Sequence, residues 1–328
     1  MKMTSKTSAN NITGIPNNHK VDKPFGNAHC IYDPKTLQCR DDSINSWTSI
    51  NYSDNQIKHN FFDTYKNWFS KPHDLNGIQE FTEACYTQGT TESFSHFYIR
   101  YQHKKRLRIA RGDYFFHQMM SRLYWKDKFT WLEDDELREG DFLVISTPFS
   151  DTGNIYPNLD NILKKCDDLD IPVMLDMAYI NIANNLKIDV SHRCIKYIVT
   201  SLSKPFPIEK HRIGIRLQRY VQKWEDQLYV INEDEYNYIP LINCHIGSQM
   251  MQKFDADYIP LKYKDKQIEI CKELNVEPSS CVIFGIDHNE KFNEYNRGRD
   301  TNRLCFSMIW DGRRAVSYTH LTLPTTGV

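Results

Sequence analysis

The pattern of apolar and polar positions is clearest in the middle of the chain. Residues 141–146 (DFLVIS) form a short apolar run with β-branched residues between Gly140 and Pro148, which is typical of a buried strand. Residues 157–170 (PNLDNILKKCDDLD) instead place their apolar groups on one helical face, and Pro157 suits the first turn of a helix. The pattern therefore predicts a buried strand followed by an amphipathic helix.

Three more apolar runs follow that helix at short intervals. They are residues 171–179 (IPVMLDMAY), whose strand is expected to end at Asp176, residues 196–204 (KYIVTSLSK) and residues 212–217 (RIGIRL). Strands and a helix joined by short connections form the βαβ pattern. The sequence thus predicts an α/β fold with a mostly parallel central sheet, flanked by helices and buried on both faces. In such sheets ligands bind at the strand ends.

The first third of the chain gives weaker signals. Residues 1–45 are rich in Asn, Lys, Thr, Pro and Asp and predict a flexible arm or irregular lead-in. Residues 56–70 have apolar groups at helical intervals, and residues 78–86 (IQEFTEACY) predict a helix that ends near Gly89. Residues 91–101 (TESFSHFYIRY) fit either a helix or a strand.

The pattern becomes more charged and more aromatic after residue 220. Residues 221–240 predict a helix with a break near Pro240, and residues 265–276 predict an amphipathic helix. Residues 279–288 and 302–310 look like strands of a smaller domain. The expected organisation is an N-terminal arm (1–55), a large domain (56–220), a smaller α+β domain (221–314) that the arm joins, and a non-native or disordered tail (315–328).

Composition narrows the class of protein. The 328 residues are 25% charged and 40% hydrophobic with a formal net charge of −1, so no basic surplus indicates a nucleic-acid partner. The N-terminus lacks an apolar core and no window approaches about 20 apolar residues, so we expect no signal peptide and no membrane span. Nine cysteines without a CxxC pair indicate reduced thiols and a cytoplasmic protein. A metal site of His29, Cys30 and Cys39 is an alternative that lacks a second ligand pair, and we expect no metal.

Reactive side chains gather at the predicted strand ends. Asp176 and Tyr179 end one strand, Lys204 ends the next, and Arg212 opens the last. A lysine that is desolvated or lies beside other cations becomes a nucleophile and can form a Schiff base with an aldehyde. Pyridoxal phosphate is such an aldehyde, and its protonated ring nitrogen needs an anion, which Asp176 supplies.

The remaining groups suit the rest of this cofactor. Its phosphate needs backbone N–H groups, hydroxyls and a guanidinium, and Tyr179 suits the ring oxygen. The candidate phosphate ligands are Gly89, Thr90, Thr91, Ser201, Ser203 and Arg212.

Taken together, these motifs resemble the fold-type I pyridoxal-phosphate enzymes, and among them the class I/II aminotransferase family. The resemblance covers roughly residues 75–216. It rests on the DMAY strand end, on a serine three positions before Lys204, on Arg212 eight positions after that lysine, and on the glycine-threonine turn upstream, all in the order that the family has.

The resemblance implies an aminotransferase that moves an amino group between an amino acid and a 2-keto acid through Lys204, with Asp176 and Tyr179 as further catalytic residues. It also implies a homodimer. A different pyridoxal-phosphate reaction (a lyase, decarboxylase or oxidase) and a degenerate non-catalytic relative remain as alternatives.

Two family features are less direct in this sequence. The family loop NPxNPTG is replaced by TPFSDTG, so Ser150 stands in the place of the asparagine that bonds the ring oxygen, and Asp151 in the place of the proline. The ring-stacking aromatic is expected to be Tyr114, with Phe115 and Phe116 as alternatives.

The last two expectations concern the substrate and the nearby histidines. A substrate carboxylate needs an arginine, for which Arg303 is the candidate and Arg297 and Arg299 are alternatives. His117 and His211 lie near the motifs, where we expect local hydrogen bonds rather than catalytic bases.

Overall fold

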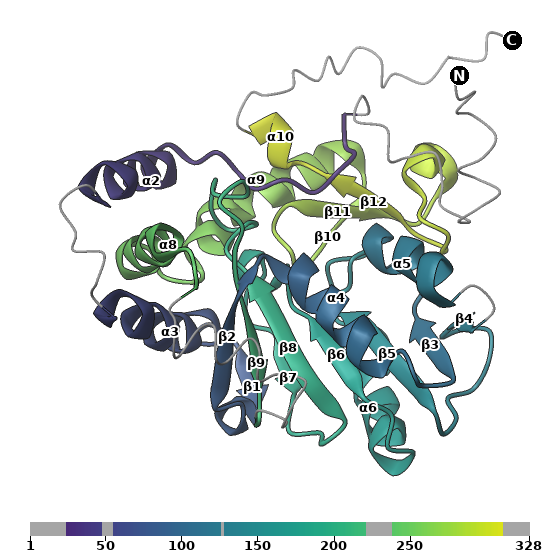
Figure 1. Cartoon of the computed structure of the whole chain (residues 1–328). Coiled ribbons are helices and arrows are strands. Elements are labelled where there is room, and N and C mark those ends of the chain that lie inside the picture. Colours follow the sequence, from purple (N-terminus) through teal and green to yellow (C-terminus); the bar gives the residue numbers. More distant parts are fainter. Residues whose placement is uncertain (1–23, 48–54, 126–127, 221–237, 311–328) are drawn as a thin grey trace, which may run out of the picture.

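The computed structural model describes residues 24–47, 55–125, 128–220 and 238–310, and its centre is a seven-stranded sheet (Figure 1). The strands lie in the order β2-β9-β8-β6-β5-β3-β4. Only β9 runs antiparallel to its two neighbours, and the other pairs are parallel, which confirms the predicted mostly parallel sheet. The strands are β2 (Glu83–Gln88), β3 (Arg106–Ile109), β4 (Phe129–Trp131), β5 (Asp141–Ser146), β6 (Val173–Asp176), β8 (Ile195–Ser201) and β9 (Ile213–Gln218).

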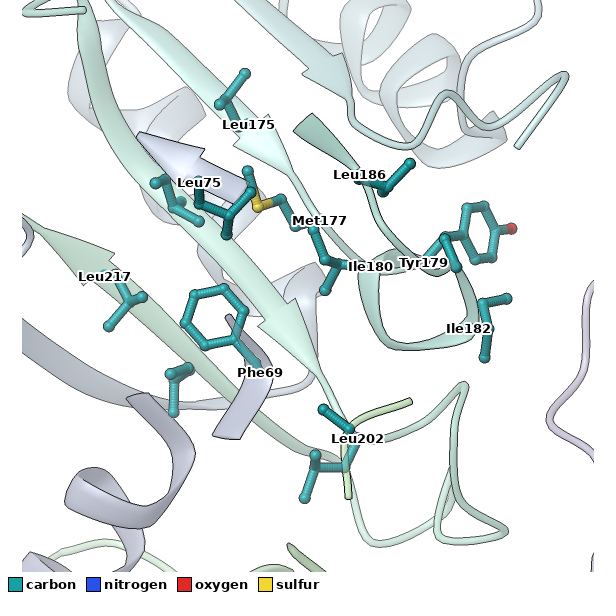
Figure 2. Close-up of a cluster of buried hydrophobic side chains, with 14 of the residues drawn as sticks. Phe69, Leu75, Leu175, Met177, Tyr179, Ile180, Ile182, Leu186, Leu202 and Leu217 are labelled. Carbon is teal, nitrogen blue, oxygen red and sulfur yellow. The ribbon is translucent and has the colours of Figure 1, made fainter. Parts of the chain in front are cut away.

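Helices cover both faces of this sheet, as its apolar strands require. Alternate residues of β5 show the two faces: Phe142 and Val144 pack with α4, whereas Leu143 and Ile145 belong to the core shared with α3, α6 and α8. Figure 2 shows part of this second core, with Phe69, Leu75 and Leu175 among its side chains. The helices around the sheet are α2 (Pro34–Ser46), α3 (Gln56–Phe69), α4 (Thr90–Tyr101), α5 (Phe115–Trp125), α6 (Leu159–Asp168) and α8 (Leu241–Lys253).

A smaller antiparallel sheet of β10, β11 and β12 lies at the top of Figure 1, beyond the edge of the central sheet. Phe25 packs in its apolar cluster with Leu274 and Phe306, and the Phe25 carbonyl accepts the Cys305 N–H at 2.9 Å. The N-terminal segment is therefore part of this smaller unit. Its elements are α9 (Tyr258–Leu274), β10 (Glu277–Pro278), β11 (Phe284–Asp287), η6 (Glu290–Tyr295), β12 (Asn302–Cys305) and α10 (Ser307–Trp310).

Short elements complete the described chain. Strands β1 and β7 form a separate parallel pair, and two single turns of 3-10 helix flank the large sheet. Their bounds are β1 (Asp74–Asn76), η3 (Ile78–Glu80), η4 (Ile180–Ile182) and β7 (Lys187–Asp189). No helix among the described residues is long and apolar enough to cross a bilayer.

Two of the predicted elements are wrong. Residues 78–86 are not a helix: after η3 the chain becomes β2, because it pairs with β9 along its whole length from Glu83↔Gln218 to Gln88↔Ile213. The arm is not irregular throughout, because α2 forms within it. Asp33 caps this helix by accepting the N–H groups of Lys35 and Thr36, and a proline follows the cap.

Other predictions differ from the structure only in extent. Residues 91–101, left open between helix and strand, are helix in α4. The strand expected over 302–310 ends at Cys305 and turns into α10, and that expected over 279–288 is confined to β11. The helix predicted over 221–240 and the tail 315–328 fall wholly or mostly outside the described residues.

Candidate functional site

A cavity of about 250 Å³ lies where β6 and β8 end and α4 begins. Parallel strands deliver their C-terminal side chains to the same edge of a sheet, which explains why groups distant in sequence meet here. Its walls come from six parts of the chain: Ala28, His29 and Cys30; Thr90 and Thr91; Tyr114; Ser146 and Ser150; Asp176, Ala178 and Tyr179; and Ser201, Ser203, Lys204, Glu209 and Arg212.

Lys204 follows β8 and is half-buried in the cavity wall. Its Nζ donates a hydrogen bond to the carbonyl oxygen of Ala28 at 2.6 Å and lies 5.4 Å from the centre of the Tyr179 ring. Tyr179 is buried and its ring meets Phe284 edge-on at 5.3 Å. The lysine amine is therefore held between the N-terminal segment and an aromatic wall.

Asp176 ends β6 and is 3% exposed. Its Oδ1 accepts the Ala178 N–H at 3.0 Å, and its Oδ2 lies 3.6 Å from Nε2 of His117. His117 is buried, and its Nδ1 lies 2.7 Å from the Tyr98 hydroxyl. His117 thus makes the expected local hydrogen bond, and it also lies next to the Asp176 carboxylate.

The other end of the cavity is rich in groups that bind anions. Thr90 and Thr91 open α4, whose first N–H groups and dipole favour a negative charge. Arg212 reaches the same end, where its guanidinium donates to the carbonyl oxygens of Gln88 (3.1 Å) and Glu209 (3.2 Å). Within the described chain, the buried Ser203 Oγ has no hydrogen-bond partner. These donors suit a phosphate group.

Gly89 allows Arg212 to approach the α4 turn, so we expect Gly89→Ala to weaken anion binding in the cavity. Its backbone has φ +71° and ψ −179°, a combination that costs other residues about 1–3 kcal/mol. A Cβ there would also collide with Nη2 of Arg212. Thermal unfolding and titration with pyridoxal phosphate measure both effects. Gly140→Ala is the control for strain alone, because Gly140 has φ +89°, an added Cβ there would meet the Lys105 side chain, and the residue does not line the cavity. Equal effects of the two variants on ligand affinity would contradict this prediction.

Ser150 lines the cavity and is fully buried. Arg303 does not reach the cavity: its guanidinium donates to the Ser150 carbonyl oxygen and lies 4.5 Å from the centre of the Phe284 ring. Arg297 also donates to Ser150, whereas Arg299 pairs with Glu133 at 2.7 Å. Of the three arginines predicted as candidates for the substrate carboxylate, Arg297 and Arg303 do not line the cavity but contact Ser150, which does.

Tyr114 lines the cavity, and Phe115 and Phe116 do not. Burial of its hydroxyl raises the pKa of Tyr114, with smaller contributions from Tyr179 and Asp176. The ring is 39% exposed and packs against Phe94 and His117. An aromatic face is therefore available next to Asp176.

The structure brings most of the predicted residues together. Two of them do not line the cavity. Gly89 packs against Arg212, and Arg303 contacts the Ser150 carbonyl oxygen. Ten line one cavity: Thr90, Thr91, Tyr114, Ser150, Asp176, Tyr179, Ser201, Ser203, Lys204 and Arg212.

Sequence reasoning missed Ser146, His29, Cys30 and Glu209. Ser146 is the last residue of β5, so the strand-end rule that selected Asp176 would have found it. The other three have no such signal. Glu209 accepts hydrogen bonds from the Tyr32 hydroxyl (2.7 Å) and the Cys30 thiol (3.1 Å), contacts between segments almost 180 residues apart.

No protein-family model and no curated protein sequence matches this chain. Solved structures do resemble it. An aromatic aminotransferase from Pyrococcus horikoshii OT3 has a TM-score of 0.61 at 12% identity, over 90% of this chain and 91% of that one. An aspartate aminotransferase from Thermus thermophilus, solved with maleate, has a TM-score of 0.59 at 12% identity, over 90% and 88%. OvoB has a TM-score of 0.62 at 11% identity, over 89% and 90%.

These likenesses show the fold. The chain has the architecture of the aminotransferases to which it is similar, and the resemblance indicated by the motifs is confirmed at that level.

Proposed function

We propose that this protein is a pyridoxal-phosphate-dependent aminotransferase in which Lys204 carries the cofactor. One observation supports this most strongly: Lys204, Asp176, Tyr179 and Arg212, which lie at the ends of three strands, line a single cavity. An amine, a carboxylate, a phenol and a guanidinium in one cavity match the aldehyde, ring nitrogen, ring oxygen and phosphate of that cofactor.

The cavity walls fit the parts of the cofactor. The α4 turn, with Thr90 and Thr91, would hold the phosphate together with Arg212 and the unpartnered hydroxyl of Ser203. Ser201 would add a second hydroxyl at that end. The ring would lie against Tyr114, with Asp176 at its nitrogen. When bound, pyridoxal phosphate accepts the electron pair left on the substrate's α-carbon.

The residues of this chain would then have separate tasks. Lys204 would hold the aldehyde of the cofactor, and its amine, when free, would be the base that moves the proton taken from the substrate α-carbon. Its Nζ already lies in the cavity beside Tyr179. Asp176, which lies 3.6 Å from His117, would keep the ring nitrogen protonated. Tyr179 would donate a hydrogen bond to the ring oxygen.

The substrate and its surroundings follow from the same proposal. Arg303 is proposed to bind the substrate carboxylate, which requires its guanidinium to turn from the Ser150 carbonyl towards the cavity. The aminotransferases of the same fold support an amino acid and a 2-keto acid as the substrate pair. A homodimer in the cytoplasm is part of the proposal, and light scattering tests the dimer.

The direct test is a half-reaction with the protein loaded with pyridoxal phosphate. A panel of amino acids is added one at a time, and the near-visible absorption of the cofactor is followed. We expect at least one amino acid to remove this band, a stoichiometric amount of the matching 2-keto acid to appear, and a second keto acid to restore the band. Release of carbon dioxide or consumption of oxygen instead of keto-acid recovery would indicate a decarboxylase or an oxidase. Failure to bind the cofactor would overturn the proposal.

A further inference from the structure

The Ser150 side chain has an unusual neighbour for a hydroxyl on a cavity wall. Nη1 of Arg297 lies 3.3 Å from Ser150 Oγ and 3.0 Å from the Ser150 carbonyl oxygen, to which Arg303 also donates. Both arginine side chains are more than nine-tenths buried. Two guanidiniums from the smaller unit thus contact one serine in the turn that follows β5.

A guanidinium can only donate hydrogen bonds, so Ser150 Oγ is the acceptor in its contact with Arg297. The hydroxyl keeps one proton, which must point to a different acceptor. In the described chain no further hydrogen bond of Ser150 Oγ is formed with a protein group, and the residue lines the cavity. The O–H of Ser150 is therefore available to an acceptor inside the cavity.

Arg297 is itself held in place from two sides. Its Nη2 donates to the Asp113 carbonyl oxygen at 3.2 Å, and its Nε lies 4.0 Å from Oδ1 of the fully buried Asp151. Asp151 is anchored by the Thr301 hydroxyl at 2.9 Å. Burial, reinforced by the nearby Arg303, lowers the pKa of Arg297 to about 10, so the guanidinium remains charged at neutral pH.

We propose that Arg297 is a positioning residue that orients the Ser150 hydroxyl as a hydrogen-bond donor to the ring oxygen of pyridoxal phosphate. This inference rests on the proposed function. Ser150 supplies one donor where an asparagine amide would supply a longer one, and the charged partner on its oxygen makes the hydroxyl a stronger donor. Asp151 contributes by placing a carboxylate beside Arg297.

The test compares pyridoxal-phosphate dissociation constants and absorption spectra of the wild type, Ser150→Ala, Arg297→Gln and the double variant. Loss of a hydrogen bond to a charged oxygen is expected to weaken binding roughly tenfold in each single variant and to shift the absorption maximum. Because Arg297 acts through Ser150, the double variant should be no weaker than the single ones. Ser150→Asn should restore affinity in the Arg297→Gln protein, since an amide donates without help from the arginine.

Arg299→Gln is the matched control. Arg299 shares Asp151 as a neighbour at 3.9 Å but contacts Glu133 rather than Ser150, so its variant should bind the cofactor within about twofold of the wild type. If Arg297→Gln does not fold, Arg297→Lys replaces it in the comparison of single and double variants. Lysine keeps the positive charge but lacks the paired N–H donors of a guanidinium.

Three outcomes overturn the inference. The first is a double variant whose loss is the product of the two single losses, which means that the residues act independently. The second is an equal loss in Arg299→Gln, which means that the arginine cluster only stabilises the fold. The third is an unchanged absorption maximum in both single variants. These results require a wild type that binds the cofactor; a wild type that does not bind it overturns the proposed function as well.

Discussion

Lys204→Ala is expected to abolish covalent attachment of pyridoxal phosphate to this protein. The wild type, mixed with the cofactor and reduced with borohydride, should carry one cofactor on the peptide that contains Lys204, and mass spectrometry identifies that peptide. The reason is geometric: Lys204 is the lysine that lines the cavity, and its Nζ faces the Tyr179 ring. An alanine provides no amine for the aldehyde.

Lys210→Ala is the control, because Lys210 is exposed on the same loop and does not line the cavity. It should be labelled at Lys204 as the wild type is. Circular dichroism of Lys204→Ala should match that of the wild type, since the alanine removes one hydrogen bond to Ala28 and one contact with the Tyr179 ring and leaves the strands in place. Labelling of the alanine variant to the wild-type extent would show that a different lysine carries the cofactor, and the assignment of Lys204 would be wrong.

The parts of the fold that were predictable are those in which a local pattern and the final environment agree. The strands β5 and β6 are continuous apolar runs because helices cover both of their faces. Helix α6 buries Leu159, Leu163 and Cys166 along one side, which is the stripe that its sequence shows. In these segments the residue types alone determine the element and its exposure.

The predictions fail where a segment distant in the sequence determines which element forms. Residues 78–86 have apolar groups at positions that suit a helix, yet the chain from Glu83 to Gln88 pairs with β9, more than 120 residues later, and is a strand. No local pattern encodes that pairing. In α2, a composition typical of an irregular arm is outweighed by the Asp33 cap and by packing of the helix against α8.

The candidate site divides in the same way. Residues at strand ends, such as Asp176 and Lys204, could be placed because the topology of a parallel sheet fixes where strands end. The position of the N-terminal wall could not be predicted, since Cys30 at the cavity contacts a loop almost 180 residues away in the sequence. Arg303 was expected at the substrate, but a carbonyl and an aromatic ring hold it one layer behind. The direction of the Arg303 side chain depends on tertiary contacts, which the spacing of the sequence motifs does not reveal.

Asp176→Asn is expected to retain the cofactor site and to lose most of the activity. Asparagine has the shape of aspartate and its Oδ1 can still accept the Ala178 N–H, so the end of β6 should keep its structure. The variant lacks the negative charge that keeps the ring nitrogen protonated, and an unprotonated ring accepts electrons poorly. Removing a single well-placed electrostatic partner from an active site slows reactions by about 10²–10³-fold.

The measurement is the single-turnover rate of the amino-acid half-reaction, with the cofactor dissociation constant determined in parallel. We expect a rate at least about 10²-fold below the wild type, with the covalent bond to Lys204 still formed. Asp160→Asn serves as the control, because Asp160 is exposed on α6, away from the cavity. If the Asp176 variant carries out the half-reaction as fast as this control does, the Asp176 carboxylate does not act on the cofactor ring. In that case the proposed orientation of the ring, with its nitrogen at the end of β6, would have to be abandoned.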